Sequence, residues 1–368
     1  MARNRVIYQS EALFVGPTGG VSATGANGLY TTESLAQLHR VQNANYSFNV
    51  SREDVNQFGQ LAALDRVILA QPTVALDFSY YTTTGTNESN LGLYVNPTGT
   101  ANLSGALVNI MQGINDVKNY YILVAPEGSD VNTNTSITGS SSTIGIGNGF
   151  LSSYSLDASV GSFVTSSANV EAYNMRFYTT ASGEIPTINP SNGSNVTGKY
   201  FHISGISTGS FISVLKPGDI TVDVSGDIGL VAGDLKVQSV SMKLDLTRED
   251  IQKLGSRFAF AKPLKFPLTT TMTIDATLGD IEADNLATLV NADCSKYSLA
   301  VTLKGASCGV TSTKQALKFY FKGAKLDSQS FTSSIGANKA VNLQFSAQIG
   351  GPTDSDNGIF IEGTETGF

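Results

Sequence analysis

A stretch of nineteen residues occurs twice in this chain. Residues 41–59 read VQNANYSFNVSREDVNQFG, and residues 237–255, which lie 196 positions further on, read VQSVSMKLDLTREDIQKLG. Ten of the nineteen positions are identical or exchange one similar residue for another. A match of this length at one offset indicates a structural unit that is present twice. We therefore expect the chain to fold as two related halves.

Each copy of this repeat is predicted to run from a strand into a short helix. Tyr46, Phe48 and Val50 alternate with polar residues, as Met242, Leu244 and Leu246 do in the second copy, and a period of two is typical of a half-buried strand. A hydroxyl three residues before a carboxylate is a helix N-cap pattern, and a glycine suits the left-handed residue that ends a helix. The residues that predict this capped helix are Ser51, Arg52, Glu53, Asp54 and Gly59 in the first copy, and Thr247, Arg248, Glu249, Asp250 and Gly255 in the second.

The Arg-Glu-Asp triplet of the repeat has a second interpretation, because paired carboxylates beside an arginine can act as a general acid and base. However, no constellation of His, Cys or Ser recurs with the triplet, so nothing supplies a reacting partner. Cys294 and Cys308 have no His nearby, which argues against a metal site and favours free thiols over a disulfide. We predict no catalytic residue, no metal, no cofactor and no enzymatic activity.

The similarity between the halves extends beyond the repeat. Leu76 and Phe78 match Met272 and Ile274 at the same offset, Leu156 is matched with Leu326, and residues 174–177 with residues 342–345. These matches predict two β domains. The first comprises residues 1–190 with an N-terminal arm, and the second comprises residues 191–368 with a C-terminal tail.

Two polar segments stand out within this division. Residues 183–198 have the Pro, Asn and Gly content of a linker, and residues 130–148 are predicted to be an exposed loop inserted in the first half. The fold class predicted is mainly β, with two tandem antiparallel β-sandwich or barrel-like domains that each carry one or two short α-helices.

The charge content limits the possible partners. Charged residues make up 14% of the chain and the net charge is −7. Residues 1–196 carry 7 basic and 13 acidic side chains, whereas residues 197–368 carry 16 and 17. This balance argues against binding nucleic acid by neutralising phosphates. The sequence also has no stretch typical of a signal sequence or a membrane span, so we expect a protein that is made in the cytoplasm and has no membrane partner.

Three features together resemble the tail tube, or major tail, proteins of bacteriophages that carry a duplicated tube domain. They are the repeat ending in Arg-Glu-Asp-Val/Ile-x-x-Phe/Leu-Gly, the opening MARNRVIYQSEALFVGP, and the low-charge, Ser/Thr-rich β composition. The resemblance implies a virion structural protein whose sheets join those of neighbours around a lumen, in stacked homotrimeric, pseudo-hexameric rings. It implies assembly in the host cytoplasm and a final location in the viral tail.

The resemblance also implies the partners. On this resemblance, the chain would contact copies of itself within and between rings, and the lumen would hold the tape-measure protein and then pass DNA during genome ejection without specific binding. Sheath, baseplate and neck proteins are further candidate partners.

Two alternatives to the tube remain open. A neck, terminator or baseplate-hub protein could use the same domain without polymerising into a long tube. A glycan- or receptor-binding β module is the other alternative; the chain has no Trp for stacking on sugars, but its 14 Tyr could serve instead.

Overall fold

The computed structural model describes residues 11–20, 35–114, 116–125, 131, 141–203, 220–225, 235–278, 296–304, 315–332 and 339–363. Strands dominate these residues, and the two helices in them are short: α1 (Thr86–Asn90) and α2 (Val108–Met111). Every strand pairing but one is antiparallel among the described residues; β7 (Val95–Pro97) and β20 (Gly358–Gly363) are parallel. The prediction of a mainly β, antiparallel fold is confirmed.

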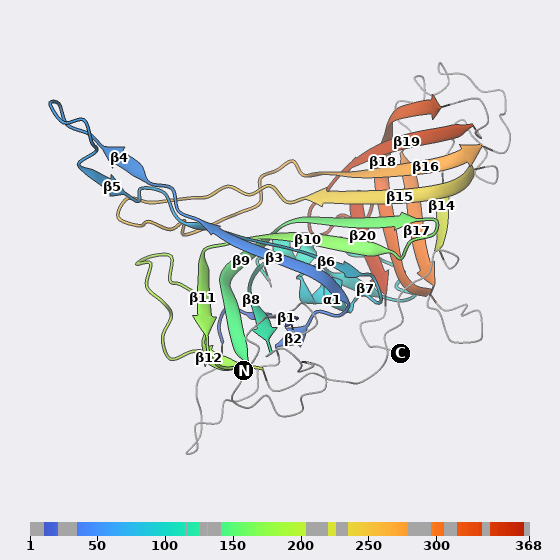
Figure 1. Cartoon of the computed structure of the whole chain (residues 1–368). Coiled ribbons are helices and arrows are strands. Elements are labelled where there is room, and N and C mark those ends of the chain that lie inside the picture. The colour runs from blue at the N-terminus through green and yellow to red at the C-terminus, as the bar shows by residue number, and fades with distance from the viewer. Residues whose placement is uncertain are drawn as a thin grey trace.

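The two halves contribute the same set of strands in the same order (Figure 1). In the first half the strands are β1 (Glu11–Pro17), β3 (Val41–Asn49), β6 (Thr73–Tyr81), β8 (Val117–Val124), β9 (Ser142–Ser159), β10 (Thr165–Ala172) and β11 (Asn174–Tyr178). Their counterparts are β14 (Ile220–Ser225), β15 (Leu235–Asp245), β16 (Thr269–Leu278), β17 (Tyr297–Lys304), β18 (Gln315–Thr332), β19 (Ala340–Gln348) and β20. The remaining strands are β2 (Ala36–Gln37), β4 (Glu53–Val55), β5 (Asp65–Val67), β12 (Ser182–Glu184) and β13 (Tyr200–His202).

The registers of the strand pairs show how closely the halves correspond. Ala44 of β3 faces Phe78 of β6, and Val240 of β15 faces Ile274 of β16, so both strands keep the offset of 196. A β-bulge interrupts the first pair between Val41 and Asn43 and the second pair between Val237 and Ser239, again 196 positions apart. A bulge is an inserted residue that bends its strand, so its repetition means that both halves bend alike at this point.

The later strands of the two halves correspond at a different offset. Ala168 of β10 faces Phe78, and Leu343 of β19 faces Ile274, so these strands differ by 175 positions (343 − 168). The same offset relates the bulge between Asn169 and Val170 to the shift between Gln344 and Phe345, and it relates β9 to β18. The counterpart of Leu156 is therefore Phe331.

This offset corrects two predicted matches. Leu156 with Leu326, and residues 174–177 with residues 342–345, are both wrong. These matches were based on local sequence identity. They are wrong because a connection of different length in the two halves changes the offset between the strands that follow it.

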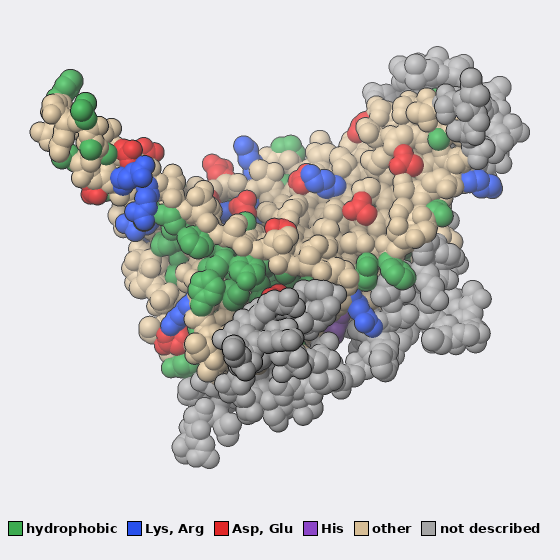
Figure 2. All heavy atoms as spheres, in the orientation of Figure 1, with side chains coloured by type: hydrophobic (Ala, Val, Ile, Leu, Met, Phe, Trp, Pro, Cys, Tyr) green, Lys and Arg blue, Asp and Glu red, His purple; other side chains and the backbone are tan. Residues whose placement is uncertain are grey.

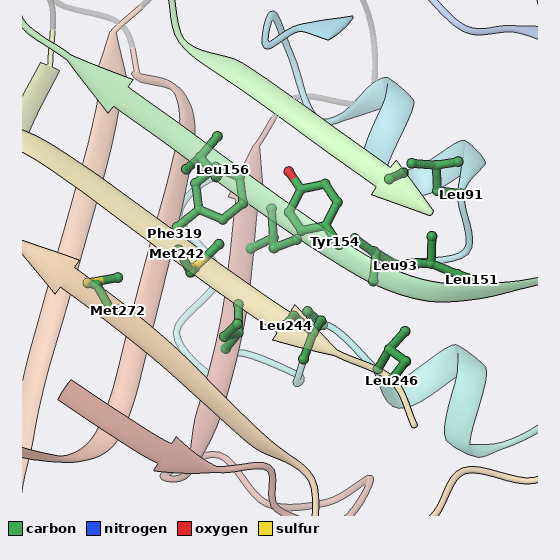
Figure 3. Close-up of a cluster of buried hydrophobic side chains, with 14 of the residues drawn as sticks. Leu91, Leu93, Leu151, Tyr154, Leu156, Met242, Leu244, Leu246, Met272 and Phe319 are labelled. Atoms are coloured by element: carbon green, nitrogen blue, oxygen red, sulfur yellow. The ribbon is translucent and has the colours of Figure 1, made fainter. Parts of the chain in front are cut away.

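One core underlies both halves. Alternate side chains of β6 and β16, among them Leu76, Phe78, Met272 and Ile274, are buried in the same cluster of side chains. Figure 3 shows this core where Tyr154 and Leu156 of β9 lie beside Met242 and Leu244 of β15, with Phe319 of β18 next to them. Because β9 and β18 are 18 residues long, each pairs with one group of strands in its first part and with another group in its second part.

The helix predicted within the repeat is wrong in both copies. Glu53 to Val55 form β4, which pairs with β5, and the second copy shows bridges from Arg248 to Leu264 and from Ile251 to Ala261. Each segment is a hairpin arm with a positive-φ glycine, Gly59 or Gly255, near its tip. An isolated helix of two turns is marginal in water, whereas pairing across a turn satisfies the same backbone groups. The predicted cap residues, Ser51, Arg52, Glu53, Asp54 and Gly59 together with Thr247, Arg248, Glu249, Asp250 and Gly255, lie on these two arms.

The predicted loop and linker also need correction. Residues 142–148 belong to β9, so the exposed loop cannot extend to residue 148; residues 130 and 132–140 lie outside the described residues, as do Cys294 and Cys308. Residues 183–198 do not form a free linker, because β12 pairs with β13 while Ile185 and Ile188 are buried. The boundary predicted near residue 190 divides neither the sheet nor the core.

A buried carboxyl group joins α1 to the sheet. Glu88 is fully buried, and its Oε1 accepts hydrogen bonds from the Tyr80 hydroxyl at 2.9 Å and from the Tyr154 hydroxyl at 3.0 Å. Burial raises the pKa of Glu88 to about 7, against the opposing effect of these hydrogen bonds. The folded protein therefore holds a proton that an unfolded chain, with an ordinary glutamate pKa, releases at lower pH.

Replacing this carboxyl group should remove a pH dependence of stability. Since the folded pKa is raised, the stability contribution is fully present below the unfolded pKa of about 4.5 and is lost as pH rises through about 7. We expect the free energy of unfolding of the parent protein to fall by on the order of 3 kcal/mol, relative to Glu88→Gln, between pH 4.5 and 8. Urea unfolding at a series of pH values measures this difference. Parallel profiles for the two proteins would contradict it.

Candidate assembly interface

The two halves meet edge to edge at one pair of strands. β15 pairs with β9 over seven residue pairs, from Ser239 opposite Ser159 to Asp245 opposite Ser153. Within this junction Met242 faces Leu156 and Leu244 faces Tyr154, and all four side chains are about 1% exposed. The first strand of the second repeat thus continues the sheet of the first half, and its apolar side chains complete the shared core.

The same kind of edge is left open on β3 and on the second part of β18. In the described residues, β3 pairs along residues 43–49 only with β6, and residues 328–332 of β18 pair only with β19. β3 is the counterpart of β15, and this part of β18 is the counterpart of the part of β9 that β15 covers. An open strand edge offers unpaired N–H and C=O groups to another chain.

The open edges carry apolar side chains at the positions that are buried in the junction. Tyr46 and Phe48 are 37% and 66% exposed, although their counterparts Met242 and Leu244 are buried. Phe331, the counterpart of buried Leu156, is 50% exposed. The half-buried strand predicted at Tyr46 and Phe48 is therefore present, but its apolar face is largely uncovered. Large exposed apolar side chains in a row mark an interaction surface.

Two grooves at matching places show the same difference. Near the junction, Val222 of β14 and residues 237–240 of β15 face Ala158 to Val160 of β9 across a groove of about 90 Å³. The counterpart groove, between Leu13 of β1 and residues 41–44 of β3, has a volume of about 270 Å³. None of its described lining residues comes from a strand that takes the place of β9. The larger groove is instead lined by Gln37, Leu38 and Arg40 in addition to β1 and β3.

The edge of β11 in the first half is open, whereas the corresponding edge of β20 in the second half is covered by β7. Ile361 of β20 is buried where β7 of the first half pairs alongside it. By the pairing of each strand with β9 or β18, Phe177 of β11 occupies the corresponding place, and its side chain is largely exposed. In the described residues, β7 of the first half thus covers the edge of β20, but no strand of the second half covers the corresponding edge of β11.

The second hairpin arm, residues 246–268, packs on the first half. The Arg248 side chain is 2% exposed, and its guanidinium donates two hydrogen bonds to the Asp116 carboxylate, at 2.6 and 3.1 Å. The guanidinium also donates to the carbonyl oxygens of Leu151 and Lys262 and lies 5.1 Å from the centre of the Phe150 ring. Lys262, itself buried, donates to the Glu171 carboxylate at 2.6 Å. These contacts fix the second arm across the junction.

The first hairpin arm, residues 50–69, has no such support. Figure 1 shows it extending away from the body, and Figure 2 shows hydrophobic side chains at its tip. Phe58 and Leu61 are fully exposed, and Arg52, the counterpart of Arg248, is exposed as well. Within the arm Arg66 forms an ion pair with Asp54. The two arms are therefore alike in sequence and differ in whether the chain itself supplies a surface for them.

The uncovered face of the sheet is polar. Its side chains are mostly Ser, Thr and Asn, with exposed carboxylates such as Asp77, Asp157 and Asp275. Neighbouring strands hydrogen-bond these groups: Asn45 donates to Asp77, and Ser239 donates to Asp275. Figure 2 shows this face with scattered acidic side chains. It has little apolar surface on which a partner protein could pack.

In the described part of the chain no group of three or more His, Cys, Asp and Glu side chains lies close enough to hold a metal ion. No helix within the described ranges is long and apolar enough to cross a membrane.

The comparisons with known proteins give no assignment. No protein-family model matches the sequence, and no curated protein matches it at a significant level.

Removing the arginine of the second arm should destabilise the protein, whereas removing its counterpart should not. Arg248→Ala leaves the largely buried Asp116 carboxylate unpaired, and we expect a loss of about 3 kcal/mol in the free energy of unfolding. Arg52→Ala, at the matched exposed position, should change it by less than about 0.5 kcal/mol. Urea unfolding of the two variants checks the difference. Equal losses would contradict the distinction between the arms.

Proposed function

We propose that this chain is a structural β protein that assembles into rings by joining its two open sheet edges. More specifically, we propose that it is a bacteriophage tail tube subunit. It would be assembled in the host cytoplasm into the viral tail, with the tape-measure protein and then DNA in the lumen. The resemblance in sequence suggests this function, and the arrangement of the two halves supports it independently.

The observation that carries the proposal is the head-to-tail order of the halves. Each half has one strand edge that pairs with the repeat strand of the other half. Within the chain, β9 of the first half pairs with β15 of the second half. The equivalent edge, on β18 of the second half, would pair with β3 of another copy. Such an interface is heterologous, so repeated copies either close into a ring or continue as an open helix. Three chains would supply six similar halves, which is the pseudo-hexameric ring.

The polar sheet face suits the lining of such a channel. A closed ring gives the sheet one face toward the core and one face toward a common space. The polar face, with Asp77, Asp157 and Asp275 among Ser, Thr and Asn, would repel phosphate groups and offer few cations to hold them. DNA could therefore pass along it without being bound.

The first hairpin arm adds a contact outside the sheet. Its counterpart is held across the junction by Arg248, whereas Arg52 of the first arm is exposed in the single chain. Phe58 at the tip of the first arm and its counterpart Leu254 are both fully exposed. In a ring, this arm would reach a neighbouring copy. Its apolar tip makes such a contact favourable, because burying exposed apolar surface stabilises an association.

Negative-stain electron microscopy of the purified protein, with its mass measured by light scattering, tests the proposal. We expect rings with a central hole, alone or stacked, and a smallest assembled species of about 116 kDa, three times the chain mass of 38.7 kDa. A neck or baseplate protein would give single rings that never stack. A species that remains monomeric at high concentration, with or without added tail components, would contradict ring assembly.

A further inference from the structure

We propose that β3 of one copy adds to β18 of the next copy antiparallel, with Tyr46 opposite Phe331. This register also places Ser47 opposite Ser330 and Phe48 opposite Gln329. The inference rests on the proposed ring assembly and adds to it the strands and the register through which one chain recognises another.

The register follows from the junction that the chain already contains. Met242 faces Leu156 there, and Lys243 faces Ser155. Subtracting 196 from the β15 residues gives Tyr46 and Ser47, and adding 175 to the β9 residues gives Phe331 and Ser330. Both offsets come from pairings inside each half, so neither of them assumes a contact between chains.

The side chains on the two edges fit this pairing on both faces. Tyr46 and Phe331 lie on the side that faces the core at the internal junction, where two aromatic rings opposite each other replace Met242 and Leu156. On the polar face, Ser47 meets Ser330 and Asn45 meets Thr332, so no like charges oppose each other. A slip of one residue would turn Tyr46 and Phe48 toward the polar face, which disfavours that register.

The larger groove lies beside the same strand edge. At the internal junction, Ala158 and Ser159, which pair with Val240 and Ser239, line the smaller groove together with Val160. In the first half, residues 41–44 of β3 line the larger groove, next to the open edge at residues 45–49. The groove and the strand edge are thus two parts of one surface.

Engineered cysteines test the register directly. Ser47→Cys with Ser330→Cys places two thiols on directly opposite residues, whose Cα atoms in an antiparallel pair lie within the range of a disulfide. Ser47→Cys with Thr332→Cys is the matched control, because it forms a directly opposite pair only if the strands slip by two residues. All three residues involved, Ser47, Ser330 and Thr332, are exposed in the single chain, so folding should be retained. Native Cys294 and Cys308 are present in both variants.

The readout is the mass on a non-reducing gel after oxidation by diamide, which accepts the two electrons and two protons that the thiol pair loses. Six strands of the sheet, β19, β16, β15, β9, β10 and β6, lie between β18 and β3, so a bond between these two must join different chains. We expect the Ser47/Ser330 variant to give a covalent trimer in most of the protein, and the control to give at least tenfold less. The native protein, treated in the same way, gives the background from its own cysteines.

Microscopy of the same samples separates two failures. Rings that form without the expected cross-link, or with equal cross-linking in the control, would overturn the register while leaving ring assembly in place. Monomers that neither cross-link nor form rings, when the native protein is also monomeric, would overturn both proposals. Selective cross-linking within rings supports both.

Discussion

The pairing of β15 with β9 is the interaction on which the rest of the structure depends. It joins two similar halves into one sheet, buries Met242 and Leu244 against Leu156 and Tyr154, and merges the two apolar cores. Because the halves follow one another in the same direction, this pairing necessarily leaves an edge of the same kind on β3 and on the second part of β18. The chain pairs one open strand edge internally and leaves similar edges open at its surface, where a second copy can pair with them.

The halves have diverged where the chain covers one of them and not the other. Arg248 is buried on Asp116 and Phe150, whereas Arg52 is exposed, although both occupy the same position of the repeat. The aromatic side chains on the open edges, Tyr46 and Phe331, replace the aliphatic pair of the internal junction. If copies join as proposed, the two kinds of junction in a ring share their backbone pairing and differ in side chains, arms and charge. Such differences allow one junction to form during folding and the other during assembly.

The sequence predicts the duplicated β architecture well and the surfaces poorly. Alternating residues such as Leu76 and Phe78 identify strands, and the offset of 196 locates their counterparts, because both depend on local patterns. The hairpin arms were missed because Ser51 to Asp54 carry a helix-cap pattern, while the pairing that overrides it involves residues far along the chain, such as Arg248 with Leu264, sixteen positions away. The correspondence of Phe331 with Leu156 was missed because a connection of different length shifts the offset between the later strands to 175. Only the strand registers show this offset. The exposure of Tyr46 could not be predicted, because burial in a core and burial against another copy give the same apolar alternation.

Amide hydrogen exchange, measured on the monomer and on the assembled protein, tests the central relation between the two junctions most directly. Residues 43–49 of β3 and 328–332 of β18 should exchange rapidly in the monomer and become protected together on assembly, since their open edges gain backbone hydrogen bonds. Residues 239–245 of β15 should be protected in both states, because their partner lies in the same chain. Assembly that leaves β3 and β18 as exchangeable as they are in the monomer would show that copies join elsewhere, and that the internal junction is no model for the contact between chains.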